Sequence, residues 1–367
     1  MKVGVLTSSR ADFGIYLPLL HALQNDDFFD LEIIAFGTHL SKEHGFTLDE
    51  IKTSGFEVKH ALDTLKDSNT PQGVAYSIAT TTETFSKFWA ENEFDLLVAL
   101  GDRYEMYAAV LASSPFDLEI AHIHAGETTL GAIDNAYRHS ISLFSKYLFV
   151  STDNYKKRAE EIVEDDVEVH NVGALSVDNL SKMSFLSIPE FKEKFKIDLE
   201  LPTILSTFHP ETVQYEKNET HISELLSTMD DLQAQYQIVI TMPNTDTMGQ
   251  MVRDKINDFK LANPNIILVE SFGMLGYLSC MKHCKFLLGN TSSGFVEAAY
   301  FPKYVINLGD RQKGRLETEN ILTIPIIKSK ILEAVHKVEN SPQLQALNTY
   351  GTGNTAEKII SIFKTNG

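Results

Sequence analysis

Titratable side chains are concentrated in one stretch of twenty residues, IAHIHAGETTLGAIDNAYRH, which runs from Ile120 to His139. It begins as an apolar strand and then brings together His122, His124, Glu127, Asp134, Arg138 and His139. Burial and neighbouring charges separate the pKa values of such groups, which suits general acid–base catalysis. The pattern therefore predicts that this segment carries acid–base chemistry.

The two histidines at the start of this segment have other possible roles. Alternate residues of a strand face the same side, so we expect His122 and His124 to point together. His-x-His is also a metal-ligand spacing, and a buried histidine is often only a hydrogen-bonded core residue. Because three charged residues follow in the same loop, we favour catalysis and expect no metal.

Two other strand ends carry charged residues. The run LLVALG is followed by Asp102 and Arg103, and the run VGVLTSS by Arg10 and Asp12. Helix N-termini offer free N–H groups, so the Arg10 loop is a predicted anion site. The alternatives are that Arg10 is a surface residue and that both aspartates cap the following helices. No glycine-rich dinucleotide motif and no Walker motif occurs, which argues against those nucleotide classes.

The second half of the chain supplies three further clusters. His209 follows the run PTILSTF, and Arg311 lies in the glycine-punctuated segment NLGDRQKGR. The segment LLGNTSSGFVEAA places small hydroxyls and a glycine before a helix, at Thr291, Ser292, Ser293 and Gly294. Such a loop predicts a phosphate cradle, with Glu297 accepting from ribose hydroxyls. A serine N-cap with Glu297 completing a capping box would predict similar residues.

Apolar runs that alternate with amphipathic stretches must position these residues. The predicted strands are Val3–Thr7, Leu31–Ala35, Leu96–Leu100, Ile120–His124, Tyr147–Val150, Val167–Val172, Thr203–Ser206, Gln237–Thr241, Ile266–Val269, Phe286–Leu288 and Tyr304–Ile306. Their apolar character predicts parallel strands covered on both faces by helices. We predict an α/β fold of two Rossmann-like, doubly wound parallel-sheet domains that face a cleft.

Length and composition limit the number of domains, the classes of partner and the expected location of the protein. The 367 residues suggest two domains, predicted at 1–172 and 173–352, with a helix at 353–367 packing back on the first. The net charge of −18 argues against nucleic acid as a partner. No apolar run approaches the roughly 20 residues that span a bilayer. The N-terminus shows no signal-peptide pattern, so we expect a cytoplasmic protein. Cys280 and Cys284 are expected to be reduced packing residues.

The ordered motifs resemble the hydrolysing UDP-N-acetylglucosamine 2-epimerases of sialic-acid biosynthesis. The resemblance runs from SRADFG through GDRYE, HIHAGETTLGAIDNAYRH and TFHP to GNTSSGFVEAA and LGDRQKGR. It implies the GT-B-like two-domain fold, with UDP bound mainly by the C-terminal domain. It also implies loss of the C2 proton, expulsion of UDP to give a 2-acetamidoglucal, and addition of water to give N-acetylmannosamine. No cofactor is needed for this chemistry.

The same resemblance assigns roles to single residues. It implies acid–base positions at Asp102, Asp134 and His209, contacts of Arg10 and Arg103 near the nucleotide diphosphate, and a UDP-binding set of Thr291, Ser292, Glu297 and Arg311. We also predict substrate contacts at Arg138, Ser293 and Gly294, which lie within the same motifs. Several relatives carry glutamate where this chain has His124. We expect His124 to act as acid or base. Glu127 or Asp134 would then supply the negative charge that a neutral imidazole lacks.

Four alternatives remain open. The same reaction on UDP-N,N′-diacetylbacillosamine, for legionaminic acid, would use the same motifs, because they do not report on C4 or C6 of the sugar. A non-hydrolysing epimerase, a glycosyltransferase of the same fold and a binding-only regulator explain the motifs less well. The resemblance also predicts a homodimer or a homotetramer.

Overall fold

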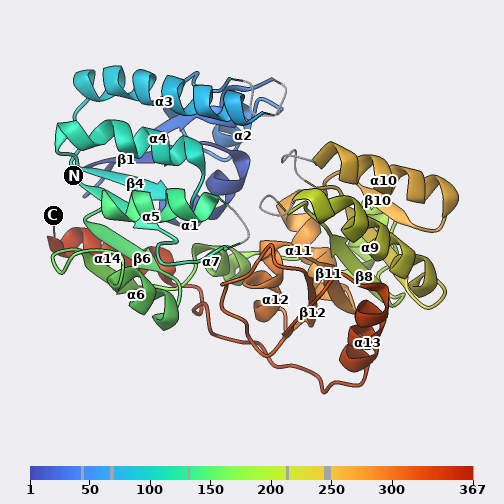
Figure 1. Cartoon of the computed structure of the whole chain (residues 1–367). Helices are drawn as coiled ribbons and strands as arrows, with labels where there is room; N and C mark the ends of the chain where they lie inside the picture. The colour runs from blue at the N-terminus through green and yellow to red at the C-terminus, as the bar shows by residue number, and fades with distance from the viewer. Residues whose placement is uncertain (43–44, 67–69, 131–132, 212–214, 244–248, 367) are drawn as a thin grey trace. The chain divides into compact units, whose positions relative to one another are not determined.

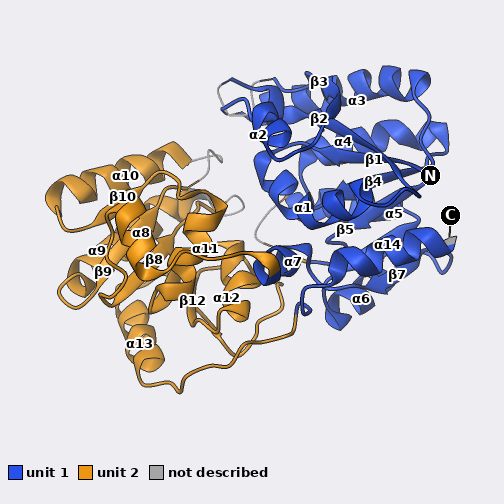
Figure 2. Ribbon diagram, turned by 180° about the vertical axis from the view of Figure 1, so that it is seen from behind, with its two compact units in different colours: residues 1–127, 134–181, 350–367 blue, residues 128–133, 182–349 orange. Residues whose placement is uncertain are grey.

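The chain forms two compact units, which are coloured separately in Figure 2. The computed structural model describes residues 1–42, 45–66, 70–130, 133–211, 215–243 and 249–366. Unit 1 comprises residues 1–127, 134–181 and 350–367, and unit 2 comprises residues 128–133 and 182–349. Among the helices of these ranges, none is long and apolar enough to cross a membrane.

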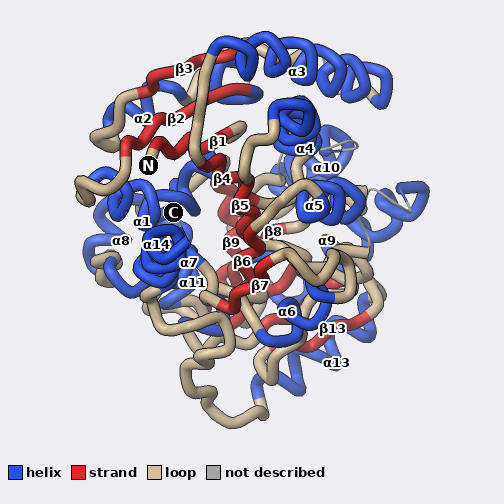
Figure 3. The backbone as a smooth tube through the Cα atoms, turned by 90° about the vertical axis from the view of Figure 1, so that its left-hand side faces the viewer, coloured by secondary structure: helices blue, strands red, loops and turns tan. Residues whose placement is uncertain are grey.

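Unit 1 is built on a parallel sheet of seven strands in the order β3-β2-β1-β4-β5-β6-β7. The strands are β1 (Lys2–Thr7), β2 (Asp30–Phe36), β3 (Val58–Leu62), β4 (Leu96–Leu100), β5 (Ile120–Ile123), β6 (Tyr147–Val150) and β7 (Glu168–Asn171). The helices are α1 (Arg10–Gln24), α2 (Leu48–Thr53), α3 (Pro71–Glu91), α4 (Tyr104–Ser113), α5 (Asp134–Leu143), α6 (Asp153–Glu160), α7 (Leu175–Lys182) and α14 (Thr355–Asn366). Helices α1 and α14 lie on one face of this sheet, and α3, α4 and α5 on the other (Figure 3).

Unit 2 repeats this plan with a parallel sheet of six strands in the order β10-β9-β8-β11-β12-β13 (labelled in part in Figure 1). The strands are β8 (Thr203–Thr207), β9 (Gln237–Thr241), β10 (Ile267–Val269), β11 (Phe286–Gly289), β12 (Val305–Leu308) and β13 (Ile321–Ile324). The helices are α8 (Ile188–Phe195), α9 (Asn218–Leu232), α10 (Gly249–Ala262), α11 (Gly273–His283), α12 (Glu297–Tyr300) and α13 (Lys328–Glu339). The predicted class of two parallel-sheet α/β domains is confirmed.

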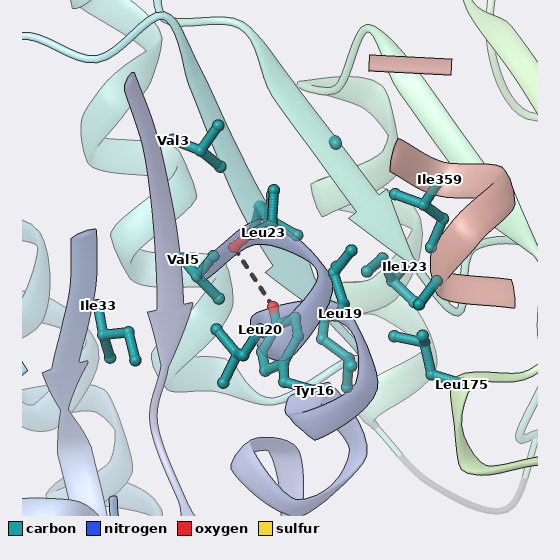
Figure 4. Close-up of a cluster of buried hydrophobic side chains, with 14 of the residues drawn as sticks. Val3, Val5, Tyr16, Leu19, Leu20, Leu23, Ile33, Ile123, Leu175 and Ile359 are labelled. Carbon is teal, nitrogen blue, oxygen red and sulfur yellow. Dashed lines mark hydrogen bonds between the residues drawn. The ribbon is translucent and has the colours of Figure 1, made fainter. Parts of the chain in front are cut away.

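Hydrophobic periodicity explains the core of unit 1. In α1, Tyr16, Leu19, Leu20 and Leu23 recur at helical spacing and pack against alternate residues of the sheet, such as Val5 (Figure 4). The Tyr16 hydroxyl donates a hydrogen bond to the carbonyl oxygen of Val98 at 3.3 Å, which satisfies the polar end of this buried ring.

Cys280 and Cys284 of unit 2 are buried free thiols, as predicted.

The C-terminal helix α14 belongs to this same core. Ile359 lies beside Leu19, Ile123 and Leu175 in Figure 4. The buried carboxylate of Asp178 accepts the backbone N–H groups of Thr355 at 2.9 Å and Ala356 at 2.8 Å. Asp178 thus satisfies the free donors at the start of α14, a role that helix ends require.

Replacement of Asp178 by alanine tests this anchoring. Asp178→Ala leaves two buried N–H groups without acceptors, so we expect the free energy of unfolding to fall by about 2 kcal/mol. Urea unfolding followed by circular dichroism measures the change. Asp49→Ala, at an exposed aspartate of the same unit, is the control and should change stability by less than about 0.5 kcal/mol. Equal effects of the two substitutions would contradict the role given to Asp178.

Candidate active site

The candidate residues follow the carboxyl ends of the parallel strands in both units. In unit 1 they come after β1, β4 and β5, and in unit 2 they come after β8, β11 and β12. Open α/β sheets bind ligands at this edge, because the strands end there and the following helices begin.

The loop after β1 is organised by the carboxylate of Asp12, which is buried. It accepts hydrogen bonds from the hydroxyl of Thr7 and from both the N–H at 2.9 Å and the hydroxyl at 2.7 Å of Ser8. Ser9 is the N-cap of α1, so Asp12 supports the cap from inside the first turn rather than serving as the cap itself. The Arg10 side chain is 61% exposed and lies 3.8 Å from Glu50.

The loop after β4 carries Asp102 and Arg103. Arg103 is the N-cap of α4, but by its backbone position and not by a side-chain hydrogen bond. Its guanidinium donates to both carboxylate oxygens of the buried Glu105, from Nη2 at 2.7 Å and from Nε at 3.2 Å. This two-pronged ion pair fixes the direction of the guanidinium, whose side chain remains 44% exposed.

Arg138 is the centre of the acid–base cluster in unit 1. Its side chain is 2% exposed, yet it carries a full positive charge. The guanidinium donates to the Asp102 carboxylate, to the Glu127 carboxylate at 3.3 Å and to the carbonyl oxygen of His124 at 2.9 Å. One arginine of α5 therefore gathers three residues from two different strand ends.

His124 does not continue the strand. β5 ends at Ile123, and His124 has a φ of +68°, in the left-handed region that few residues other than glycine adopt. The prediction that His122 and His124 share one face of a strand is therefore wrong, because the alternation stops before His124. Its Nδ1 lies 3.7 Å from the Glu127 carboxylate. Gly126 has a φ of +70° and packs closely against Tyr155. A Cβ at this position would lie 2.1 Å from the carbonyl oxygen of Tyr155, so only glycine fits.

His122 is fully buried and hydrogen-bonded through both ring nitrogens. Nε2 lies 2.8 Å from the carbonyl oxygen of Gly101, and Nδ1 lies 3.0 Å from the hydroxyl of Ser142. Burial lowers the pKa of His122 to about 3, with the charge of Arg138 acting in the same direction. His122 is thus a neutral core residue, the alternative that the sequence left open.

Asp134 begins α5 one helical turn before Arg138. Residues four apart lie on the same helix face, so the chain places Asp134 on the side of the Arg138 cluster. The ring of Tyr137 stacks against Tyr107 of α4 at a centroid distance of 5.4 Å. Burial, followed by the charge of Asp134, raises the pKa of Tyr137, which keeps this phenol protonated.

In unit 2, His209 is tied to the end of β11. The backbone N–H of His209 donates to the side-chain oxygen of Asn290 at 2.7 Å. The side-chain amide of Asn290 donates back to the backbone carbonyl of His209 at 2.8 Å. Gln312 adds a hydrogen bond to the carbonyl of Asn290 at 2.8 Å. Arg311, the preceding residue, donates to the carbonyl of Pro210 at 3.3 Å. The fold thus brings the His209 and Arg311 loops together.

The segment after β11, for which the sequence predicts a phosphate cradle, is a short helical turn. Ser292–Gly294 is a 3₁₀ turn that leads into α12, which begins at Glu297. Gly294 lies directly over Val305, where a Cβ would approach to 2.9 Å. No side-chain hydrogen bond caps either helical turn, so a capping box does not account for Glu297. The cradle's role in binding remains a prediction.

Tyr277 of α11 is a polar residue of this region that the sequence analysis missed. Its buried hydroxyl lies beside Thr207, Ser293 and Thr291, and near Glu297. Burial, and then the charge of Glu297, raises the pKa of Tyr277 to about 12. Helical spacing in the sequence makes this tyrosine look like a core residue, and no local signal shows which loop its hydroxyl faces.

Among the described residues, no group of three His, Cys, Asp or Glu could hold a metal ion.

The central position of Arg138 can be tested through stability. Arg138→Met removes the buried counter-charge of Asp102 and Glu127, and breaking a buried ion pair costs about 3–5 kcal/mol. We therefore expect a loss of this size in the free energy of unfolding, measured in urea. Arg158→Met breaks an exposed pair with Glu161 and should cost less than about 1 kcal/mol. A loss for Arg138→Met as small as the control's would contradict the role given to Arg138.

The neutral state of His122 predicts a pH dependence. The pKa of His122 is lower in the folded protein than the value of about 6.5 for unfolded histidine. The unfolded chain therefore binds this proton first, and stability falls as the pH drops below about 6.5. Between about pH 6 and pH 5, the wild type should lose about 1 kcal/mol more than His122→Gln. Urea unfolding at both pH values measures the difference, and equal losses would show that His122 is not held neutral.

Comparisons with known proteins agree with this architecture. Residues 21–364 match the UDP-N-acetylglucosamine 2-epimerase family. A GDP/UDP-N,N′-diacetylbacillosamine 2-epimerase (hydrolysing) from Campylobacter jejuni is 33% identical over 92% of this chain and 88% of its own. Polysialic acid biosynthesis protein P7 from Escherichia coli is 30% identical over 99% and 93%.

Solved structures show the same fold. The UDP-GlcNAc 2-epimerase of Neisseria meningitidis, bound to UDP-GlcNAc, superposes with a TM-score of 0.85 at 20% identity, with both chains fully covered. The enzyme of Methanocaldococcus jannaschii, in complex with UDP-GlcNAc and UDP, gives a TM-score of 0.79 at 19% identity, again with full coverage of both. The paired parallel sheets and the family match over residues 21–364 lead to one conclusion: this chain belongs to the UDP-N-acetylglucosamine 2-epimerase family.

Proposed function

We propose that the protein is a hydrolysing 2-epimerase, which converts UDP-N-acetylglucosamine and water to N-acetylmannosamine and UDP. The observation that carries the proposal is the cluster in which Arg138 holds Asp102 and Glu127 beside His124. Removing a weakly acidic C–H proton needs several fixed titratable groups, and this cluster supplies them. The full-length relatives named as hydrolysing epimerases support the same reaction class.

The proposed reaction has two halves. In the first, a base of the unit 1 cluster takes the C2 proton, and the C1–O bond breaks so that UDP leaves with the electron pair. The product is a 2-acetamidoglucal. In the second half, water adds its oxygen to C1, and a proton returns to C2 on the opposite face. Asp102, His124, Glu127 and Asp134 are the proposed acid–base groups, together with His209 of unit 2.

Unit 2 is proposed to hold the UDP group. Hydroxyls of the cradle at Thr291, Ser292 and Ser293 would donate to phosphate oxygens, and Glu297 would accept from ribose hydroxyls. Gly294 allows the turn to approach Val305 closely, because it has no Cβ. Positive charges stabilise the developing charge of the departing diphosphate, and Arg10, Arg103 and Arg311 are proposed to supply them. A homodimer or homotetramer remains a prediction from the family resemblance.

A second substrate has specific support. Two relatives, from Campylobacter jejuni and Legionella pneumophila, match over 88% and 96% of their own length and are named as hydrolysing diacetylbacillosamine 2-epimerases. The same C1 and C2 chemistry on UDP-N,N′-diacetylbacillosamine is therefore the second candidate. The two sugars differ at C4 and C6, away from the atoms that react.

Proton NMR in deuterated water tests the function directly. With UDP-N-acetylglucosamine, we expect free UDP and N-acetylmannosamine that carries deuterium at C2. Asp102→Asn should lower kcat by at least about 100-fold, since it removes a proposed acid–base group. Asp49→Asn, at an exposed position of the same unit, should leave kcat within about two-fold.

The other outcomes separate the alternatives. UDP-N-acetylmannosamine without free sugar would identify a non-hydrolysing epimerase. Turnover of UDP-N,N′-diacetylbacillosamine alone would favour the second candidate. Failure to release UDP from either sugar would overturn the proposed function.

A further inference from the structure

His122 joins two of the segments that carry the proposed acid–base residues. Its ring lies in β5 with no solvent exposure, and both nitrogens are within 3.0 Å of a partner. One partner is the carbonyl of Gly101, which directly precedes Asp102. The other is the hydroxyl of Ser142 on α5, one turn after Arg138.

The partners determine which nitrogen carries the proton. A carbonyl oxygen can only accept, so Nε2 is protonated and donates to Gly101. Nδ1 then accepts from the hydroxyl of Ser142. Since burial disfavours the imidazolium, this tautomer is a fixed part of the fold near neutral pH.

The contact with Gly101 bears directly on Asp102. Gly101 has a φ of +81°, so the chain turns sharply between the end of β4 and the aspartate. The hydrogen bond from His122 holds the carbonyl of that turn at 2.8 Å. On the other side, Asp102 is held by Arg138, which belongs to the same helix as Ser142. A closed loop of contacts thus fixes Asp102 from its backbone and from its side chain.

We propose that His122 is a positioning residue for Asp102: its imidazole bridges Gly101 and Ser142 and thereby sets the aspartate relative to Arg138 and His124. This inference rests on the proposed function for its kinetic readout. Its structural consequence, the place of the Asp102 carboxylate, does not depend on that function. A misplacement of a reacting group by about 1 Å lowers the rate by about 100-fold, so positioning of this kind is detectable.

Two substitutions of His122 separate positioning from packing. His122→Gln keeps an N–H donor that can reach Gly101, whereas His122→Leu fills a similar volume without one. We expect His122→Leu to lower kcat by about 10- to 100-fold, with KM within about two-fold. His122→Gln should recover at least about ten-fold of the loss. His170→Leu, on edge strand β7 of the same sheet, is the control and should leave kcat within about two-fold.

An isotope effect excludes a trivial loss of folded enzyme. With substrate deuterated at C2, slower proton removal in His122→Leu should raise the isotope effect on kcat above the wild-type value. A smaller fraction of folded protein would lower the rate and leave the isotope effect unchanged. Equal kcat values for the Leu and Gln variants would overturn the proposal, as would an unchanged isotope effect where the wild-type effect is below its full intrinsic value.

Crystal structures of the two variants test the inference without any activity. In His122→Leu the Asp102 carboxylate should move away from Arg138, and in His122→Gln it should stay. An unmoved Asp102 in His122→Leu overturns the positioning role, whatever the kinetics show. If the wild type turns over neither sugar but Asp102 moves as expected, the proposed function fails and the positioning role stands.

Discussion

A buried guanidinium is the constraint on which the acid–base cluster depends. Arg138 is 2% exposed, and a charge taken out of water is costly unless it is paired with opposite charge and hydrogen-bonded. Its acceptors are Asp102, Glu127 and the carbonyl of His124. The loops after β4 and β5 must therefore converge on α5, because the free energy of a lone buried cation would otherwise oppose folding. The left-handed backbone of His124 is one consequence of this convergence.

The two units contribute different physical chemistry. Unit 1 holds its strand-end loops with charges, in the pairs Arg138–Asp102 and Arg103–Glu105. Unit 2 combines neutral hydrogen bonds, such as the reciprocal pair between His209 and Asn290, with contacts of charged groups, such as the Glu211 carboxylate with the backbone N–H of Asp310. Charged groups suit proton transfer, whereas amides and hydroxyls bind an anion without taking part in proton exchange. The proposed roles still draw on both units, since His209 of unit 2 joins the acid–base groups and Arg10 and Arg103 of unit 1 are proposed to contact the diphosphate.

The fold class follows from the sequence because most strands are central and buried on both faces. Such strands are short continuous apolar runs, and their length and the turn residues that bound them distinguish them from buried helix segments. The strands that the sequence analysis missed are β3 and β13, each at an edge of its sheet. Both are partly exposed; β3 (VKHAL) mixes polar and apolar residues, whereas β13 (ILTI) is largely apolar but only four residues long. Each of these edge strands is held in the sheet by hydrogen bonds to one neighbouring strand, and such long-range pairing cannot be read from a local sequence pattern.

The sequence by itself determined which kinds of side chain follow the strands. Residues such as Asp102 and Thr291 come directly after apolar runs, so their place near a strand end can be read from the sequence. Only the tertiary structure decided their partners. Arg138 meets Asp102 across 36 positions of sequence, and His122 and His124 separate because the strand ends between them. Tyr277 reaches the cradle from a helix whose pattern looks like core. Local patterns record which groups are available, but long-range packing sets which of them meet, because burial requires each polar group to find an acceptor or donor in space rather than in sequence.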